Sequence, residues 1–152
     1  MSAVPVCIKA AQLRSAHGVD NVREWLEDGK NVYVGRKQRI FIHTGRAPPA
    51  DLQTLPVGAF VDSRDRVVER FVLPQSVWHN PFQIDKSEPL ADEHVRVVRQ
   101  YEDYLAERLA NDDDGKLRQQ LYALRGKNLG CWCAPPLACH ARALATLVNS
   151  LA

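Results

Sequence analysis

Three of the chain's four cysteines and one of its five histidines lie between Cys131 and His140, in the stretch GCWCAPPLACHARAL. Cysteine thiolates and histidine imidazoles are the usual ligands of structural zinc, and three sulfurs with one nitrogen complete a tetrahedral set. We therefore predict a zinc site formed by Cys131, Cys133, Cys139 and His140. The compact spacing differs from the usual two separated knuckles, and neighbouring side chains diverge on a helix. A thiol-based active site and cysteines that serve only packing remain as alternatives.

A second group of residues suited to ligand recognition lies in the sequence SVWHNPFQI. Asn80 precedes Pro81 and is therefore restricted to extended conformations, with Trp78 and Phe82 as apolar anchors on either side. A side-chain amide offers paired hydrogen-bond donors and acceptors, and an aromatic ring offers a stacking face, which suits recognition of a base or sugar. We predict that Trp78 and Asn80 bind such a ligand. A turn pinned by two buried aromatic side chains is the alternative.

The sequence around the cysteines predicts how they are positioned. KNLGCWC is typical of a buried strand, on which Cys131 and Cys133 point to the same face. Pro135 and Pro136 stiffen the turn that follows, and Cys139 opens the last helix. Because a helix N-terminus stabilises a thiolate, Cys139 is well placed either for metal binding or for thiol chemistry.

The rest of the chain predicts an α/β fold. In the first half, the pattern indicates a short helix from Asp20 to Gly29, strands in NVYV and QRIFIH, and a hairpin around residues 62–65. Apolar spacing of three and four predicts a helix over residues 92–110, another from Leu117 to Gly126 and a closing helix. The buried stripe of the first of these helices is expected to consist of Val95, Val98, Tyr101, Leu105 and Leu109. A single compact domain with a mixed sheet and helices packed on it accounts for this order.

Composition excludes several classes of protein. Apolar residues make up 45% and charged residues 25%, as in globular domains, while the net charge of +2 is too small to identify a nucleic-acid binder by itself. We expect no membrane span and no signal peptide, and therefore an intracellular, cytoplasmic protein. Structural disulfides are not expected in such a reducing compartment.

Four segments resemble, in order, the domain-of-unknown-function 4326 family of bacteria, phages and large DNA viruses. They are VYVGR (32–36), VWHNPF (77–82), LRGKNLGCWCAPPLACH (124–140) and LATLVN (144–149). The resemblance implies a small intracellular α/β domain that works on a nucleotide or nucleic acid. It also implies a site made of Arg36, Asn80 and the Cys-His run, in which the arginine would contact phosphate.

The chain departs from the family pattern in three places. His79 stands where the family has glycine, residues 37–75 lengthen the segment before Trp78, and Ala141 and Arg142 replace a Gly-Asp pair. If that acidic residue orients the histidine or acts as a base, this chain has lost it. The alternative function is therefore a structural or interaction protein, for example a viral component, that keeps the fold and binds a protein partner through strand edges in residues 37–75.

Overall fold

The computed structural model describes residues 2–133 and 138–151. It divides into two compact units, which we call the main unit (residues 1–36 and 76–152) and the hairpin unit (residues 37–75). The main unit contains β1 (Val4–Cys7), α1 (Ala10–His17), α2 (Val22–Trp25), β2 (Asn31–Tyr33), α3 (Leu90–Ala110), α4 (Lys116–Tyr122), β6 (Asn128–Cys131) and α5 (His140–Asn149). The hairpin unit contains β3 (Gln38–His43), a 3-10 turn (Leu52–Thr54), β4 (Phe60–Val61) and β5 (Val67–Leu73).

A parallel sheet in the order β1-β6-β2 organises the main unit. The central strand β6 pairs Cys131 with Cys7 on one side and Gly130 with Tyr33 on the other. Because all three strands run the same way, their carboxyl ends meet at one edge of the sheet. Ligands of open α/β sheets bind outside this edge, so the segments that leave it are the first candidates for a site.

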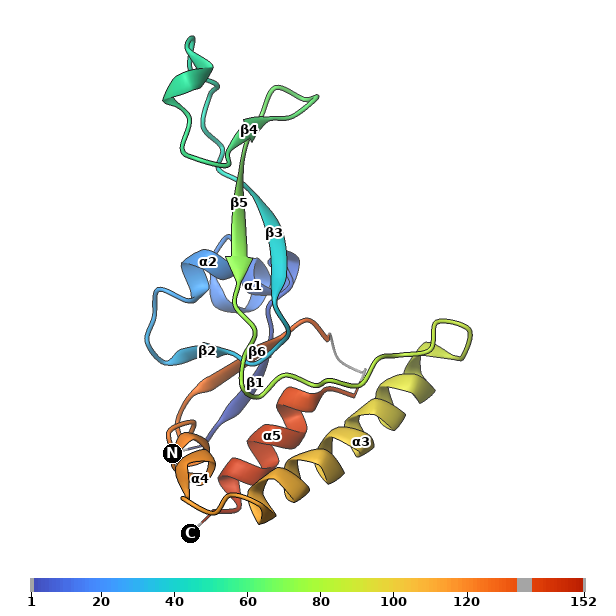
Figure 1. Cartoon of the computed structure of the whole chain (residues 1–152). Coiled ribbons are helices and arrows are strands. Elements are labelled where there is room, and N and C mark those ends of the chain that lie inside the picture. Colours follow the sequence, from blue (N-terminus) through green and yellow to red (C-terminus); the bar gives the residue numbers. More distant parts are fainter. Residues whose placement is uncertain (1, 134–137, 152) are drawn as a thin grey trace. The chain divides into compact units, whose positions relative to one another are not determined.

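Helices lie on both sides of the sheet that contains β6 (Figure 1). The side chains of β6 alternate between these two faces. Gly130 faces Trp25 of α2, and a Cβ atom on this glycine would stand 2.7 Å from both the Trp25 ring and the Ile8 side chain. Its neighbours Leu129 and Cys131 point to the other face, where they join the buried cluster that contains Leu144 of α5. Glycine at position 130 is therefore required for the close approach of α2 to the sheet.

The long helix α3 packs beside α5 and closes the second face (Figure 1). The predicted stripe is confirmed at Tyr101 and Leu105, which are buried. At the start of the helix the prediction was wrong, because Val95 is 47% exposed and Val97 is buried instead. Val97, Tyr101 and Leu105 follow an unbroken spacing of four, which keeps one face of the helix against the core.

The hairpin unit is an antiparallel sheet in the order β3-β5-β4. The predicted hairpin is confirmed, since β4 and β5 pair around a turn in which Asp62 accepts hydrogen bonds from the amides of Arg64 and Arg66. Asp65 has a φ of 59°, a conformation that aspartate tolerates better than most residues. Residues 37–75 therefore form a sheet of their own.

The predicted α/β class is confirmed, although the strands form two separate sheets rather than one mixed sheet. The sequence did not reveal β1 and α1, and the predicted helix from Asp20 to Gly29 is shortened to Val22–Trp25. The predicted turn at Pro135 and Pro136 lies outside the described residues. Among the residues that are described, no helix has both the length and the apolar character needed to cross a membrane.

Candidate functional site

Gly35 and Arg36, which we call the Gly-Arg step, end the sequence VYVGR and lie just after β2. The Tyr33 hydroxyl donates a hydrogen bond of 2.6 Å to the carbonyl of Arg36 and accepts one of 3.2 Å from the indole N–H of Trp132. Burial is the main cause of a raised pKa for Tyr33, so its hydroxyl stays protonated and able to donate. A Cβ atom at Gly35 would overlap the Tyr33 ring. The glycine thus allows the tyrosine to fold back and connect the ends of β2 and β6.

Arg36 holds the loop that contains the VWHNPF sequence. Its Nε donates to the carbonyl of Asn80 at 2.7 Å, and its Nη2 donates to the carbonyl of Phe82. A guanidinium has five N–H donors, and these bonds to described residues use two of them. Arg36 is an exposed residue, so the remaining edge of the guanidinium can bind a ligand from solvent.

Trp78 and Asn80 fasten the same loop to α3. Trp78 is only 3% exposed, and its carbonyl accepts a hydrogen bond of 2.7 Å from the hydroxyl of Tyr101. The Asn80 amide donates to the Val97 carbonyl at 3.1 Å and accepts from the Phe82 amide at 3.0 Å. The structure therefore shows a turn pinned by a buried aromatic. Trp78 offers no open ring face for stacking, and a ligand-binding role for either residue stays a prediction.

Two histidines lie next to Arg36. His79 Nδ1 is 2.8 Å from the carbonyl of Ser76, and His140 Nε2 is 2.7 Å from the carbonyl of Val34. Because a carbonyl only accepts, each of these nitrogens carries a proton, and the other ring nitrogen has a lone pair when the ring is neutral. Burial lowers the pKa of His140, and the charges of Arg36 and His79 lower it further, against the effect of the bond to Val34. His140 is therefore neutral near pH 7.

The cysteines form a separate group at the carboxyl end of β6 and the start of α5. The sulfur atoms of Cys131, Cys133 and Cys139 all lie within 4.8 Å of one another, close enough for one metal ion to contact all three. The first and third are buried, and Cys133 is half-buried. Burial and the nearby Cys7 raise the pKa of Cys133, so this residue is a poor thiolate nucleophile.

Cys131 and Cys139 are joined as a disulfide, which the sequence analysis did not expect. A strand end and a helix start converge here and bring the two sulfurs together. Their Cα atoms are 7.6 Å apart. Most disulfides span about 4.4–6.8 Å between Cα atoms, so this backbone spacing is wider than a disulfide prefers. Two cysteines that bind the same metal ion are not limited to this range of distances between their Cα atoms.

His140 does not belong to the group of three sulfurs that could hold a metal. Its Nε2 bonds Val34, and its ring packs edge-on against Tyr101 with the centroids 5.1 Å apart. This arrangement follows the divergence of adjacent side chains at a helix start. Arg142 lines the small cavity beside the cysteines. Positive charge there favours thiolates.

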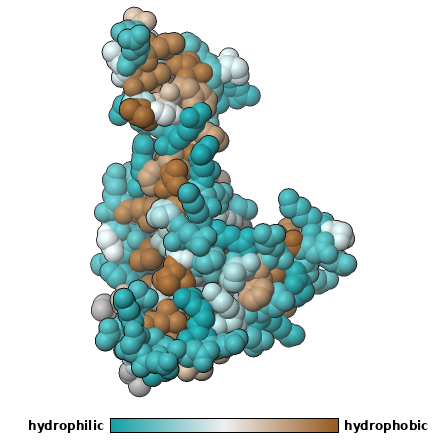
Figure 2. All heavy atoms as spheres, viewed as in Figure 1, coloured by the Kyte–Doolittle hydropathy of each residue, from teal (hydrophilic) through white to brown (hydrophobic). Residues whose placement is uncertain are grey.

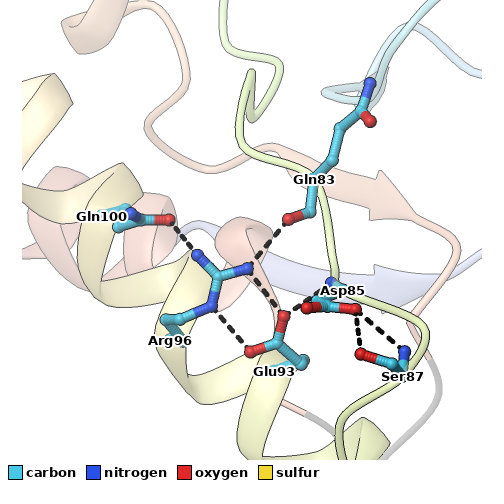
Figure 3. Close-up of polar contacts among 6 residues, drawn as sticks. All are labelled: Gln83, Asp85, Ser87, Glu93, Arg96 and Gln100. Atoms are coloured by element: carbon cyan, nitrogen blue, oxygen red, sulfur yellow. Dashed lines mark hydrogen bonds and ion pairs between the residues drawn. The ribbon is translucent and has the colours of Figure 1, made fainter.

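An ion pair between the buried Glu93 and the exposed Arg96 holds the chain that follows Phe82 (Figure 3). Glu93 is 5% exposed, accepts two hydrogen bonds from Arg96 and accepts a third from the amide of Asp85. Arg96 also donates to the carbonyl of Gln83 and to the side chain of Gln100. The Arg96 hydrogen bonds are the largest cause that lowers the pKa of Glu93 to about 2. The network connects the start of α3 to the loop that Arg36 holds.

The structure thus brings Arg36, Asn80 and His140 together, and it places the cysteines around another cavity. That cavity has neither Arg36 nor Asn80 among its lining residues. The sequence analysis missed Tyr33 and Trp132, which connect the two strand ends. Tyr33 lies in the sequence VYVGR and Trp132 lies in GCWC. Their closeness in sequence to Arg36 and to the cysteines could have identified them as candidates.

Comparison with known proteins agrees with this arrangement of sequence segments. A family model described as "Domain of unknown function (DUF4326)" matches residues 19–150. No curated protein and no solved structure gave a significant match. The matched range includes the Gly-Arg step, the loop after the hairpin unit and the cysteine run. The chain therefore belongs to the DUF4326 family.

Proposed function

We propose that this protein binds a nucleotide or nucleic acid through Arg36 and holds a zinc ion in its reduced cysteine cluster. One observation carries the first part: two backbone carbonyls fix the Arg36 guanidinium, yet Arg36 is an exposed residue just beyond the carboxyl end of a strand in a parallel sheet. Ligands of open α/β sheets bind at this edge. A fixed guanidinium is also a good partner for phosphate, because less side-chain freedom is lost on binding.

Next to Arg36, two imidazoles add polar groups of a different kind. When neutral, His79 has a lone pair on Nε2, and His140 has one on Nδ1, since the opposite nitrogens bond backbone carbonyls. A guanidinium with neighbouring nitrogen acceptors complements a ligand that has both phosphate oxygens and N–H or O–H donors. Nucleotides combine these groups, which is why we prefer them to simple carboxylates.

Zinc fits the sulfur cluster better than other common ions. Thiolate ligands select zinc and other soft metals over magnesium or calcium. In a tetrahedral site with Zn–S bonds of about 2.3 Å, the sulfurs stand about 3.8 Å apart, within the 4.8 Å that the three cysteines satisfy. A thiol-based active site is less well supported, because burial raises the pKa of Cys133.

Isothermal titration with nucleoside mono-, di- and triphosphates and with short single-stranded DNA and RNA tests the nucleotide proposal. We expect Arg36→Gln to weaken binding by about 10- to 100-fold, which corresponds to the loss of a charged hydrogen bond. Arg14→Gln, which removes an exposed arginine from α1, is the matched control and should leave the affinity unchanged. Equal affinity of Arg36→Gln and the wild type would exclude the proposal, as would no binding by the wild type.

Zinc content is tested on protein purified with a thiol reductant and without added metal. Elemental analysis should find about one zinc per chain. Zinc content that does not change after Cys133→Ala would exclude the cluster as the metal site, and a metal-free wild type would exclude the zinc proposal.

An interaction role is the second candidate, and the hairpin unit favours it. Phe41, Phe60 and Val72 share one face of its antiparallel sheet, and both Phe41 and Val72 are exposed. Apolar surface also covers the part of this unit that contains β4 and the 3-10 turn (Figure 2). Such a face, with β3 as an edge strand, suits pairing with another chain.

Sedimentation of the protein over a range of concentrations tests whether a second copy is the partner. We expect a concentration-dependent dimer that Val72→Glu disrupts. If the wild type stays monomeric at every concentration, a second copy of the chain is not the partner.

A further inference from the structure

The chain's fourth cysteine lies at the cysteine cluster although it is far away in sequence. Cys7 is the last residue of β1, and Cys131 is the last residue of β6. The two are direct partners in the parallel register. Side chains of paired residues on neighbouring strands point to the same face of a sheet, so both thiols face the layer that contains α5.

All four cysteines line the same small cavity. Its volume is about 30 Å³, and Pro5, Val6 and Arg142 complete its wall. A water molecule occupies about this much space in the liquid, so the cavity has room for a single ion but not for an organic ligand. The cavity therefore has the size and the sulfur-rich wall of a metal site.

We propose that Cys7 is the fourth ligand of an all-cysteine zinc site with Cys131, Cys133 and Cys139. This inference rests on the proposed zinc site and identifies its last ligand, in place of His140. Cys7 is a free thiol outside the tight group of three sulfurs. The proposal requires the Cys7 side chain to turn about its Cα–Cβ bond, towards the other sulfurs around the cavity that it already lines. It also lies outside residues 19–150, the part of the chain that the family model matches.

The charges around the cavity favour four thiolates. Four thiolates and one Zn²⁺ carry a net charge of −2, which a buried site tolerates only with compensation. Arg142 lines the cavity, and the charge of Lys9 acts on Cys133. Cys139 is the N-cap of α5, where unpaired amides and the helix dipole favour negative charge. Arg142, Lys9 and the start of α5 thus compensate the negative charge of a four-thiolate site.

Zinc binding requires the reduced cluster. A dithiol reductant transfers two electrons and two protons to the Cys131–Cys139 bond, which breaks into two thiols while the reductant forms its own disulfide. All four thiols then release their protons as the metal binds. The oxidised protein keeps Cys7 and Cys133 as free thiols and lacks half of the ligand set.

Competition with a chromogenic zinc chelator, under reducing conditions, tests the fourth ligand. We expect Cys7→Ser to weaken zinc affinity at least 100-fold relative to the wild type, and His140→Gln to change it less than about threefold. The visible absorption of the Co²⁺-substituted protein, which depends on the number of bound thiolates, should be that of four sulfurs in the wild type. It should change to a three-sulfur spectrum in Cys7→Ser and remain unchanged in His140→Gln.

Several results would overturn the assignment. If Cys7→Ser binds zinc as tightly as the wild type and keeps its cobalt spectrum, Cys7 is not a ligand, although the three-cysteine site stands. If His140→Gln alone loses affinity and its spectrum changes, histidine is the fourth ligand. If the reduced wild type binds no zinc, both the proposed site and this inference fail. Far-UV circular dichroism of each metal-free variant establishes that it is folded.

Discussion

Cys139 and His140 are neighbours in the sequence, yet they belong to two regions of different character. The cysteine cluster consists of Cys7, Cys131, Cys133 and Cys139 around a small cavity. The arginine site consists of Arg36, the loop of residues 77–82 and the histidine rings beside them. The first is lined by sulfur, whereas the second consists of polar groups around the exposed residue Arg36.

The difference shows how one helix start serves two purposes. The side chain of the N-cap residue, Cys139, points to the cysteines, and the next side chain bonds a carbonyl beyond β2. Cys139 has an extended backbone and His140 begins the helix, so these two adjacent side chains point in different directions. Under our proposals, the cluster stabilises the fold and the arginine site binds the ligand.

Cys139→Ala has the largest expected effect on stability, because it removes a ligand from the proposed structural zinc site. In the reduced, zinc-loaded protein it should lower the free energy of unfolding by more than about 4 kcal/mol, since a structural metal contributes directly to folding. Urea unfolding with and without a zinc chelator measures this effect. Chelation should destabilise the wild type and have no effect on Cys139→Ala.

Arg14→Gln is the control for this measurement and should stay within about 0.5 kcal/mol of the wild type, because it changes an exposed helix position. If chelation leaves the wild-type stability unchanged, the cysteine cluster does not hold a structural metal, and the contrast between the two regions disappears.

How much of the site the sequence could predict depends on how far apart its residues lie along the chain. The convergence of Cys131, Cys133 and Cys139 was predictable, because the three lie within nine residues of one another in the sequence. The position of Cys7 was not, since it depends on which strand pairs with β6. The carbonyls that hold Arg36 belong to a loop fixed by buried contacts with α3, which no local pattern reveals.

Tyr101→Phe has the next largest expected effect and acts on the arginine site. Its hydroxyl donates to the buried carbonyl of Trp78, so the variant leaves that carbonyl without its donor. An unsatisfied buried acceptor costs about 1–3 kcal/mol, and we expect a loss of unfolding free energy in this range. Zinc affinity should not change. Urea unfolding and the chelator competition measure the two quantities.

Tyr104→Phe is the matched control, because Tyr104 contacts the Phe82 ring edge-on and this packing survives removal of the hydroxyl. We expect its stability to stay within about 0.5 kcal/mol of the wild type. A loss of zinc affinity in Tyr101→Phe would show that the two regions are coupled rather than independent.

The fold was predictable where apolar periodicity is long, as in α3, and where a turn separates two β-branched runs, as in the hairpin of β4 and β5. The strand β1 was not predictable. It has only four residues and contains Pro5, which normally argues against a strand. The order β1-β6-β2 explains its presence, because β1 is an edge strand and an edge tolerates proline.

Glu93→Gln has the smallest expected effect and tests the far end of the arginine site through pH. Hydrogen bonds from Arg96 and Asp85 lower the pKa of Glu93 from 4.5 to about 2. A lowered carboxylate pKa stabilises the folded state above pH 4.5, and this contribution is lost as the pH falls from 4.5 towards about 2. The wild type should therefore be more stable than Glu93→Gln at neutral pH, and the difference should shrink over this acidic range. Urea midpoints of both proteins at several pH values measure it. A difference that does not depend on pH would mean that Glu93 stabilises the loop by packing alone.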